Sequence, residues 1–94
     1  MVLTFTGEII YWRGPSPYYF VPVPEQASQQ IKDIAKFVTY GWGVIPVQAR
    51  IGQTDFKTSL FPKADRYLVP VKDLVRKAEN LDQGQTVTVR LDVL

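Results

Sequence analysis

Aromatic and cationic side chains gather around two glycine-bearing loops of the sequence. Trp12 and Arg13 begin the first loop, and Trp42 stands between two glycines in the second. Aromatic rings next to arginine can stack against nucleic-acid bases or another planar ligand. They can equally cover a thin core in a small protein, because each ring buries a large area. We therefore name Trp12, Arg13 and Trp42 as candidate ligand-binding residues and keep the capping of a core as the alternative.

Positive charge recurs in the second half of the sequence. Lys57, Lys72 and Arg76 are the candidates there, two of them on one predicted helix. Lysine and arginine near a helix N-terminus can hold phosphate or a nucleic-acid backbone. The alternative is a solvated helix face, since on a helical wheel Arg76 points away from the apolar stripe. Asp73 and Glu79 also dilute the charge.

The composition lacks several residue types on which enzymes commonly rely for catalysis. The chain has no His and no Cys, so it lacks a Ser-His-Asp relay, a thiol nucleophile, a disulfide and the usual zinc ligands. Thr58 and Ser59 offer hydroxyls, and Lys57 or Lys72 could act as a base, but nothing in their spacing requires this. We expect no catalytic residue, no metal and no cofactor.

The totals are those of a single small domain of 94 residues, 46% hydrophobic and 21% charged, with a net charge of +2. The charge is mild for a dedicated nucleic-acid binder. No apolar run approaches the roughly 18 residues of a membrane span, and the first residues lack the pattern of a secretory signal. We expect a cytoplasmic protein that does not bind a membrane.

Alternating hydrophobicity predicts the strands. In the first half we expect strands over 2–12, 18–23 and 44–51, with a helix over 24–37. The pair Gly52-Gln53 is typical of a two-residue hairpin turn.

In the second half we expect strands over 54–61, 67–71 and 86–93, with a helix over 70–81. The inward face of this helix is predicted to carry Val71, Leu74, Val75, Ala78 and Leu81.

The order β-β-α-β therefore occurs twice, and the phrase Val-Pro-Val precedes the helix each time. Proline ends a strand and begins a helix at little cost. The repeat predicts an all-β fold with two helices: a closed, pseudo-symmetric, six-stranded barrel made of two ββαβ units, about 1–51 and 52–94. A chance echo in a Val-Pro-rich sequence is the alternative.

A known family shares many short motifs with this chain. Residues 41–93 carry most of them: Gly41-Trp42-Gly43, Ile51-Gly52, Thr58-Ser59-Leu60-Phe61-Pro62, Tyr67-Leu68, Pro70-Val71-Lys72, Val75-Arg76-Lys77-Ala78-Glu79 and Gly84. The N-terminal third agrees more loosely, through Phe5, Trp12 and Pro24-Glu25. With these motifs the chain closely resembles the family called domain of unknown function 1905, whose activity is unassigned.

That family is similar in fold to the double-split barrel of AbrB-type transition regulators, which are bacterial proteins. There, a strand, a Pro-opened helix with an Arg, a Gly-Asp turn and a strand form one half of a swapped dimer. Residues 66–92 resemble this unit, although Gln83-Gly84-Gln85 replaces the Gly-Asp step. The resemblance implies that this chain carries both halves in one polypeptide.

Three functions remain open at this point. The first is a non-catalytic binding module for a small ligand or a partner protein, acting through the aromatic loops. The second is an AbrB-like DNA-binding regulator, which is disfavoured because a fused monomer loses the two-fold pairing that matches palindromic half-sites. The third is an unidentified enzyme. We expect a monomer or a weak homodimer.

Overall fold

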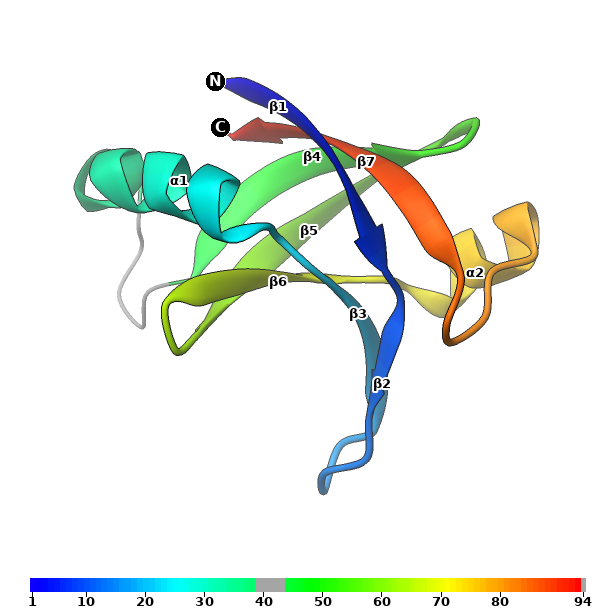
Figure 1. Ribbon diagram of the computed structural model, residues 1–94. Helices are drawn as coiled ribbons and strands as arrows, with labels where there is room; N and C mark the ends of the chain where they lie inside the picture. Colours follow the sequence, from blue (N-terminus) through cyan, green and yellow to red (C-terminus); the bar gives the residue numbers. More distant parts are fainter. Residues whose placement is uncertain (39–43, 94) are drawn as a thin grey trace.

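The computed structural model describes residues 1–38 and 44–93, with residues 36–38 described by their backbone alone. The chain folds into an antiparallel sheet flanked by two helices, which confirms the prediction of a mostly β protein with two helices (Figure 1). No helix within these residues is long and apolar enough to cross a bilayer.

Seven strands form one curled sheet in the order β1-β7-β4-β5-β6-β3-β2. The elements are β1 (Val2–Glu8), β2 (Ile10–Trp12), β3 (Tyr18–Pro22), α1 (Glu25–Val38), β4 (Ile45–Ile51), β5 (Thr54–Lys63), β6 (Arg66–Pro70), α2 (Asp73–Glu79) and β7 (Thr86–Val93). Gly52 has a φ of 60° at the turn between β4 and β5, in agreement with the predicted hairpin.

The predicted closed six-stranded barrel is wrong, because the first strand breaks. The sequence alternates without interruption over 2–12, yet the chain leaves β7 after Glu8 and pairs with β3 from Ile10 onward. Between them, the Ile9 N–H donates to the Gln85 carbonyl and the Ile9 carbonyl accepts from the Gly84 N–H, both at 2.9 Å. The sheet is therefore a curled half-barrel whose two end strands, β1 and β2, follow one another in the chain.

The ladders of this sheet occur in matched pairs. Phe5 lies opposite Val89 where β1 pairs with β7, and Phe56 lies opposite Ala49 where β5 pairs with β4. In the same way, the β2–β3 ladder has the same register as the junction of β5 with β6. A given position in the first half of the chain therefore has a counterpart of known residue number in the second half.

In two further ladders, a strand of the first half of the chain pairs with the strand that corresponds to it in the second half. Val21 lies directly opposite Val69 where β3 pairs with β6, and Arg50 lies opposite Arg90 where β4 pairs with β7. Residues that face their own counterparts mark a local two-fold relation between the paired strands. The register thus agrees with the repeat of Val-Pro-Val in the sequence.

One apolar cluster fills the concave side of the sheet. Its fully buried large side chains are Ile9, Val21, Val23, Ile31, Ile45, Val47, Leu60, Val69, Val71, Val75, Val89 and Leu91. β-Branched residues dominate this set, as expected for side chains packed on a pleated surface. At about 25 cal/mol per Å² of buried apolar area, this cluster supplies the main driving force for folding.

Helix α1 is attached to β6 through a buried serine. Ser28 is completely buried, and its hydroxyl donates to the Val23 carbonyl and accepts from the Tyr67 N–H, at 3.1 and 3.2 Å. Ile31 lies in the core, as predicted. Because every polar group of Ser28 has a partner, its burial costs little.

Helix α2 departs from the predicted inward face. Val75 is fully buried, but Leu74 is 75% exposed and Ala78 is also exposed. The helix has only seven residues and ends at Asn80, which adopts the left-handed conformation. A helix of this length has room for one buried turn, so a five-residue apolar stripe overestimates its contact with the sheet.

Candidate ligand-binding groove

The outer face of the β2–β3 hairpin carries aromatic rings. Val21 points into the core, so alternation along the strand places Phe20 and Tyr18 on the opposite, outer side. Trp12 lies opposite Tyr18 in the ladder and is 43% exposed. Phe61 of β5 is 45% exposed. We call the surface formed by Trp12, Tyr18, Phe20, Phe61 and Lys63 the aromatic groove.

Two adjoining hollows make up this groove. The larger, of about 430 Å³, is lined by Ser16, Pro17, Tyr18, Phe20, Thr58, Ser59, Phe61 and Pro70. The other, of about 350 Å³, is lined by Trp12, Ser16, Phe20, Pro62, Lys63 and Leu68. Since both share Ser16 and Phe20, the two hollows are neighbours along one surface. Each is open and mainly apolar, with a few hydroxyl and amino groups.

Edge-to-face contacts hold the rings of the groove in place. The Tyr18 and Phe20 ring centroids are 5.6 Å apart with an interplanar angle of 64°, and those of Phe20 and Phe61 are 6.4 Å apart at 88°. Such T-shaped pairs are favoured by the ring quadrupoles. They hold Phe20 upright as a ridge between the hollows, so the groove is formed before any ligand binds.

Trp12 is held by two neighbours from different parts of the chain. The Lys63 ammonium lies 3.8 Å from the centroid of the Trp12 ring, a close cation–π contact. Gly14 has no side chain, and any Cβ there would collide with the indole. In the matched ladders Trp12 and Lys63 occupy counterpart positions, so this contact links the two halves of the chain.

A second row of aromatic and arginine side chains lies on the inner face of the same hairpin. The Tyr11 and Tyr19 ring centroids are 4.6 Å apart. The Arg76 guanidinium carbon lies 3.6 Å from the centroid of Tyr19, and that of Arg13 lies 5.9 Å from the centroid of Tyr11. The structure therefore brings the predicted residues Arg13 and Arg76 into one row through two tyrosines.

Arg76 corrects the prediction of a solvated helix face. Its side chain is only 23% exposed and packs over Tyr19, and its Nε is buried with no hydrogen-bond partner. Asp73 approaches one terminal nitrogen at 3.4 Å and Asp82 approaches the other at 4.0 Å. With two carboxylates beside it, this guanidinium is partly neutralised and poorly suited to hold an anion.

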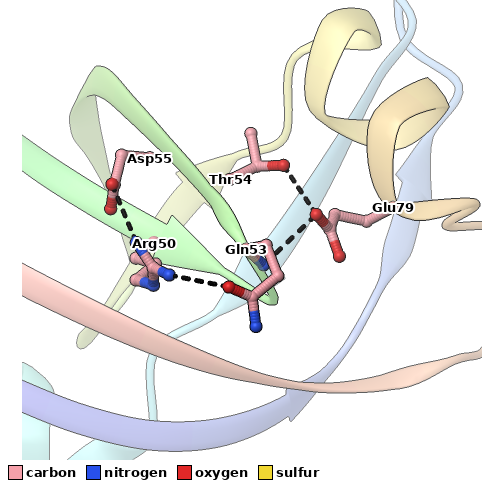
Figure 2. Close-up of polar contacts among 5 residues, drawn as sticks. All are labelled: Arg50, Gln53, Thr54, Asp55 and Glu79. Carbon is pink, nitrogen blue, oxygen red and sulfur yellow. Dashed lines mark hydrogen bonds and ion pairs between the residues drawn. The ribbon is translucent and has the colours of Figure 1, made fainter.

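Two hydrogen bonds hold the carboxylate of Glu79 in place. It accepts the Thr54 hydroxyl at 2.6 Å and the Gln53 N–H at 3.2 Å, while Arg50 bonds to Asp55 at 2.8 Å (Figure 2). The two contacts of Glu79 attach α2 to the turn between β4 and β5, while the Arg50–Asp55 pair joins the two strands of that hairpin. The positive φ of Gly52 favours glycine at this turn, and a Cβ there would displace the Glu79 carboxylate from its hydrogen bonds.

Two tyrosines have perturbed acidity. Burial and, to a smaller extent, the negative charge of Asp73 raise the pKa of Tyr18 above 10.0. Burial alone raises the pKa of Tyr67 above the same value. Both phenols therefore stay protonated near neutral pH, and Tyr18 remains a hydrogen-bond donor at the rim of the groove.

The comparisons with known proteins bear on this fold. The family model described as Domain of unknown function (DUF1905) matches residues 5–91. The chain belongs to that family. A comparison with curated proteins found no match.

In this DUF1905 member the predicted site residues do not form a single cluster. Trp12 lies in the groove, whereas Arg13 and Arg76 lie in the inner row. Lys57 is exposed on β5 opposite Gln48, and Lys72 is exposed immediately before α2. Trp42 lies outside the described residues.

Sequence reasoning missed two aromatic residues of the groove, Phe20 and Phe61, both of which lie in predicted strands. A signal was present in Tyr18–Pro22, where hydrophobic residues occupy both faces of a strand rather than one. In a thin sheet, the face away from the core is then left apolar and open to a ligand.

Thr58 and Ser59 line the larger hollow, but no hydrogen bond joins either hydroxyl to a lysine within residues 1–38 and 44–93. Across the same residues, no group of three or more His, Cys, Asp or Glu is placed to hold a metal ion. The groove offers stacking and hydrogen-bonding surfaces.

Proposed function

We propose that this protein is a non-catalytic binding module that holds its ligand or partner in the aromatic groove. The observation that carries the proposal is the exposure of Trp12 and Phe61, 43% and 45%, beside two adjoining hollows. Exposed apolar surface costs solubility, so an exposed aromatic cluster on a small domain marks an interaction site. Rigid aromatic side chains are also the residues that dominate binding energies.

The inner row supports the groove and does not compete with it. Arg76 and Tyr19 pack against the side of the hairpin that faces away from Phe20. Stacking of guanidinium and ring holds β3 between an inner and an outer aromatic layer. The hairpin is therefore stiffened, which lowers the conformational entropy lost on binding.

Indole, a small aromatic probe, tests the proposal. Titrating indole into the ¹⁵N-labelled protein should shift the backbone amide resonances of Phe20, Phe61 and their neighbours in a saturable way. Phe61→Ser should weaken the effect, while Leu74→Ser, which removes an apolar side chain of α2 that is even more exposed than Phe61, should leave it unchanged. Shifts spread over the surface, or centred on α2, would contradict the proposal.

The matched ladders also support, as a finer proposal, two ββαβ units arranged as in the double-split barrel of AbrB-type regulators. This likeness concerns the fold. A DNA-binding role would need more free cations on one face than Lys57 and Lys63 supply, and Arg76 and Arg50 are each paired with carboxylates. Binding to duplex DNA that falls steeply with added salt would restore that alternative.

A further inference from the structure

We propose that the aromatic groove binds an extended, proline-rich protein segment that carries acidic residues beside its prolines. This inference rests on the proposed function and adds the chemical class of the partner.

The shape of the groove favours a narrow, extended ligand. The two hollows lie on either side of the Phe20 ridge and share its ring. A polyproline II helix has three residues per turn and a rise of about 3.1 Å per residue, so prolines on one side recur every turn. Successive turns of such a helix can occupy successive hollows, with the ridge between them.

The energetics also favour proline. Both hollows are open, so a flexible peptide would lose more conformational entropy than these shallow contacts return. A proline-rich segment is already extended before it binds, and proline rings pack well on aromatic faces. The Phe20 and Phe61 rings are nearly perpendicular to each other, with an interplanar angle of 88°. The wall of the groove therefore contains aromatic rings in two orientations.

Hydrogen-bond donors are present where such a ligand needs them. A polyproline II segment has carbonyl acceptors and few N–H donors, so its groove must donate. Ser59 and Tyr18 contribute hydroxyls to the lining of the larger hollow. Neither hydroxyl makes a hydrogen bond to another described residue.

Charge complementarity identifies the flanking residues of the partner. Lys57 and Lys63 stand on the same outer face of β5 as Phe61, one on each side of it. Neither lysine forms an ion pair with a carboxylate in the described part of the chain. Two unpaired cations beside an apolar groove favour an acidic partner over a basic one.

Peptide binding followed by the fluorescence of Trp12 tests the inference. The chain has two tryptophans, so a Trp42→Phe variant makes Trp12 the single reporter. The probes are an oligoproline peptide with two aspartates at one end, the same peptide with two lysines, and an acidic Gly-Ser peptide of equal length. We expect the acidic oligoproline to bind most tightly and the Gly-Ser peptide to bind weakest.

Variants then locate the site. Phe61→Ser should weaken the acidic oligoproline by about tenfold or more, and Leu74→Ser should leave its affinity unchanged. Lys63→Glu should reverse the preference between the acidic and the basic peptide. Circular dichroism of each variant shows whether it is folded, and any that is not is replaced by Phe61→Leu or Lys63→Gln.

Three outcomes would overturn the inference. The first is equal binding of the oligoproline and Gly-Ser peptides. If indole still binds at the groove, the proposed function stands and only the proline partner is lost. The second is indifference to the charge of the peptide, which removes the acidic flank. The third is a concentration-dependent dimer, abolished by Phe61→Ser, which would make a second copy of the chain the occupant.

Discussion

The β2–β3 and β5–β6 hairpins pair in the same register with different side chains. Trp12 lies opposite Tyr18 at the tip of the first, and Lys63 lies opposite Arg66 at the tip of the second. The first hairpin is therefore aromatic at its tip, and the second is cationic. Since a strand ladder is built from main-chain groups, the same register accommodates both sets of side chains. The proposed binding function rests on the aromatic tip.

The two helix junctions also have the same backbone contact with different side chains around it. The Val23 N–H bonds to the Tyr67 carbonyl at 2.8 Å, and the Val71 N–H bonds to the Tyr19 carbonyl at 2.9 Å. At the first contact Ser28 is buried against Tyr67, whereas at the second Arg76 covers Tyr19. The small Ser28 side chain therefore packs at the junction before α1, and the long Arg76 side chain packs at the junction before α2.

The largest expected effect is on the free energy of unfolding, at a pair of buried positions that the two halves of the chain share. Ile9 and Leu60 are both fully buried, at the points where the chain changes ladder partners. Replacing either by alanine should lower the free energy of unfolding by about 2–5 kcal/mol, measured by urea denaturation. Phe61→Ala, one position from Leu60 but half exposed, should cost clearly less. A large loss for only one of the two buried residues would break the comparison.

Substitutions at the two helix junctions should lower the free energy of unfolding by intermediate and unequal amounts. Ser28→Ala leaves the buried Tyr67 N–H without its acceptor, which should cost about 1–3 kcal/mol. Arg76→Met keeps an unbranched side chain over Tyr19 and removes the cation, so it should cost about 0.5–1 kcal/mol. Chemical denaturation of both variants gives the two values. If Arg76→Met proves the more damaging, the bridged junction is the structural one.

The smallest effect is a pH response of the aromatic hairpin. The pKa values of Tyr18 and Tyr67 are raised above 10.0, and Asp73 contributes only to the first. Because the folded state holds these protons more tightly, their stabilisation is complete below pH 10.0 and is lost as the pH rises further. Asp73→Asn should lower the pKa of Tyr18 and leave that of Tyr67 unchanged in a tyrosine titration followed by NMR. A shift in both would show that Asp73 acts through the fold.

Most strands and both helices could be predicted because alternation and proline placement are local signals. The break at Ile9 could not, since the apolar alternation runs straight through it and only the partner strand changes. Arg76 was misplaced for a similar reason. A helical wheel shows that it avoids the apolar stripe, but its contact with Tyr19 depends on a strand far away in the sequence.

The candidate site was predicted only in part. Trp12 was named from its loop, but its neighbours come from two other strands, Phe20 from β3 and Phe61 and Lys63 from β5. Their meeting depends on the curl of the sheet, which a single sequence does not encode locally. Arg13 was expected beside the same ligand, and it lies instead over Tyr11 on the inner face.

The contact of Lys63 with Trp12 has a consequence for stoichiometry. These residues stand at matched positions but are chemically unlike, and each completes the surroundings of the other. An assembly of two identical halves would repeat its recognition surface and bind twice. Under the proposed function, the unlike pair places the aromatic groove on one side of the described structure only, so the module would hold its partner once and would not cross-link two copies of it.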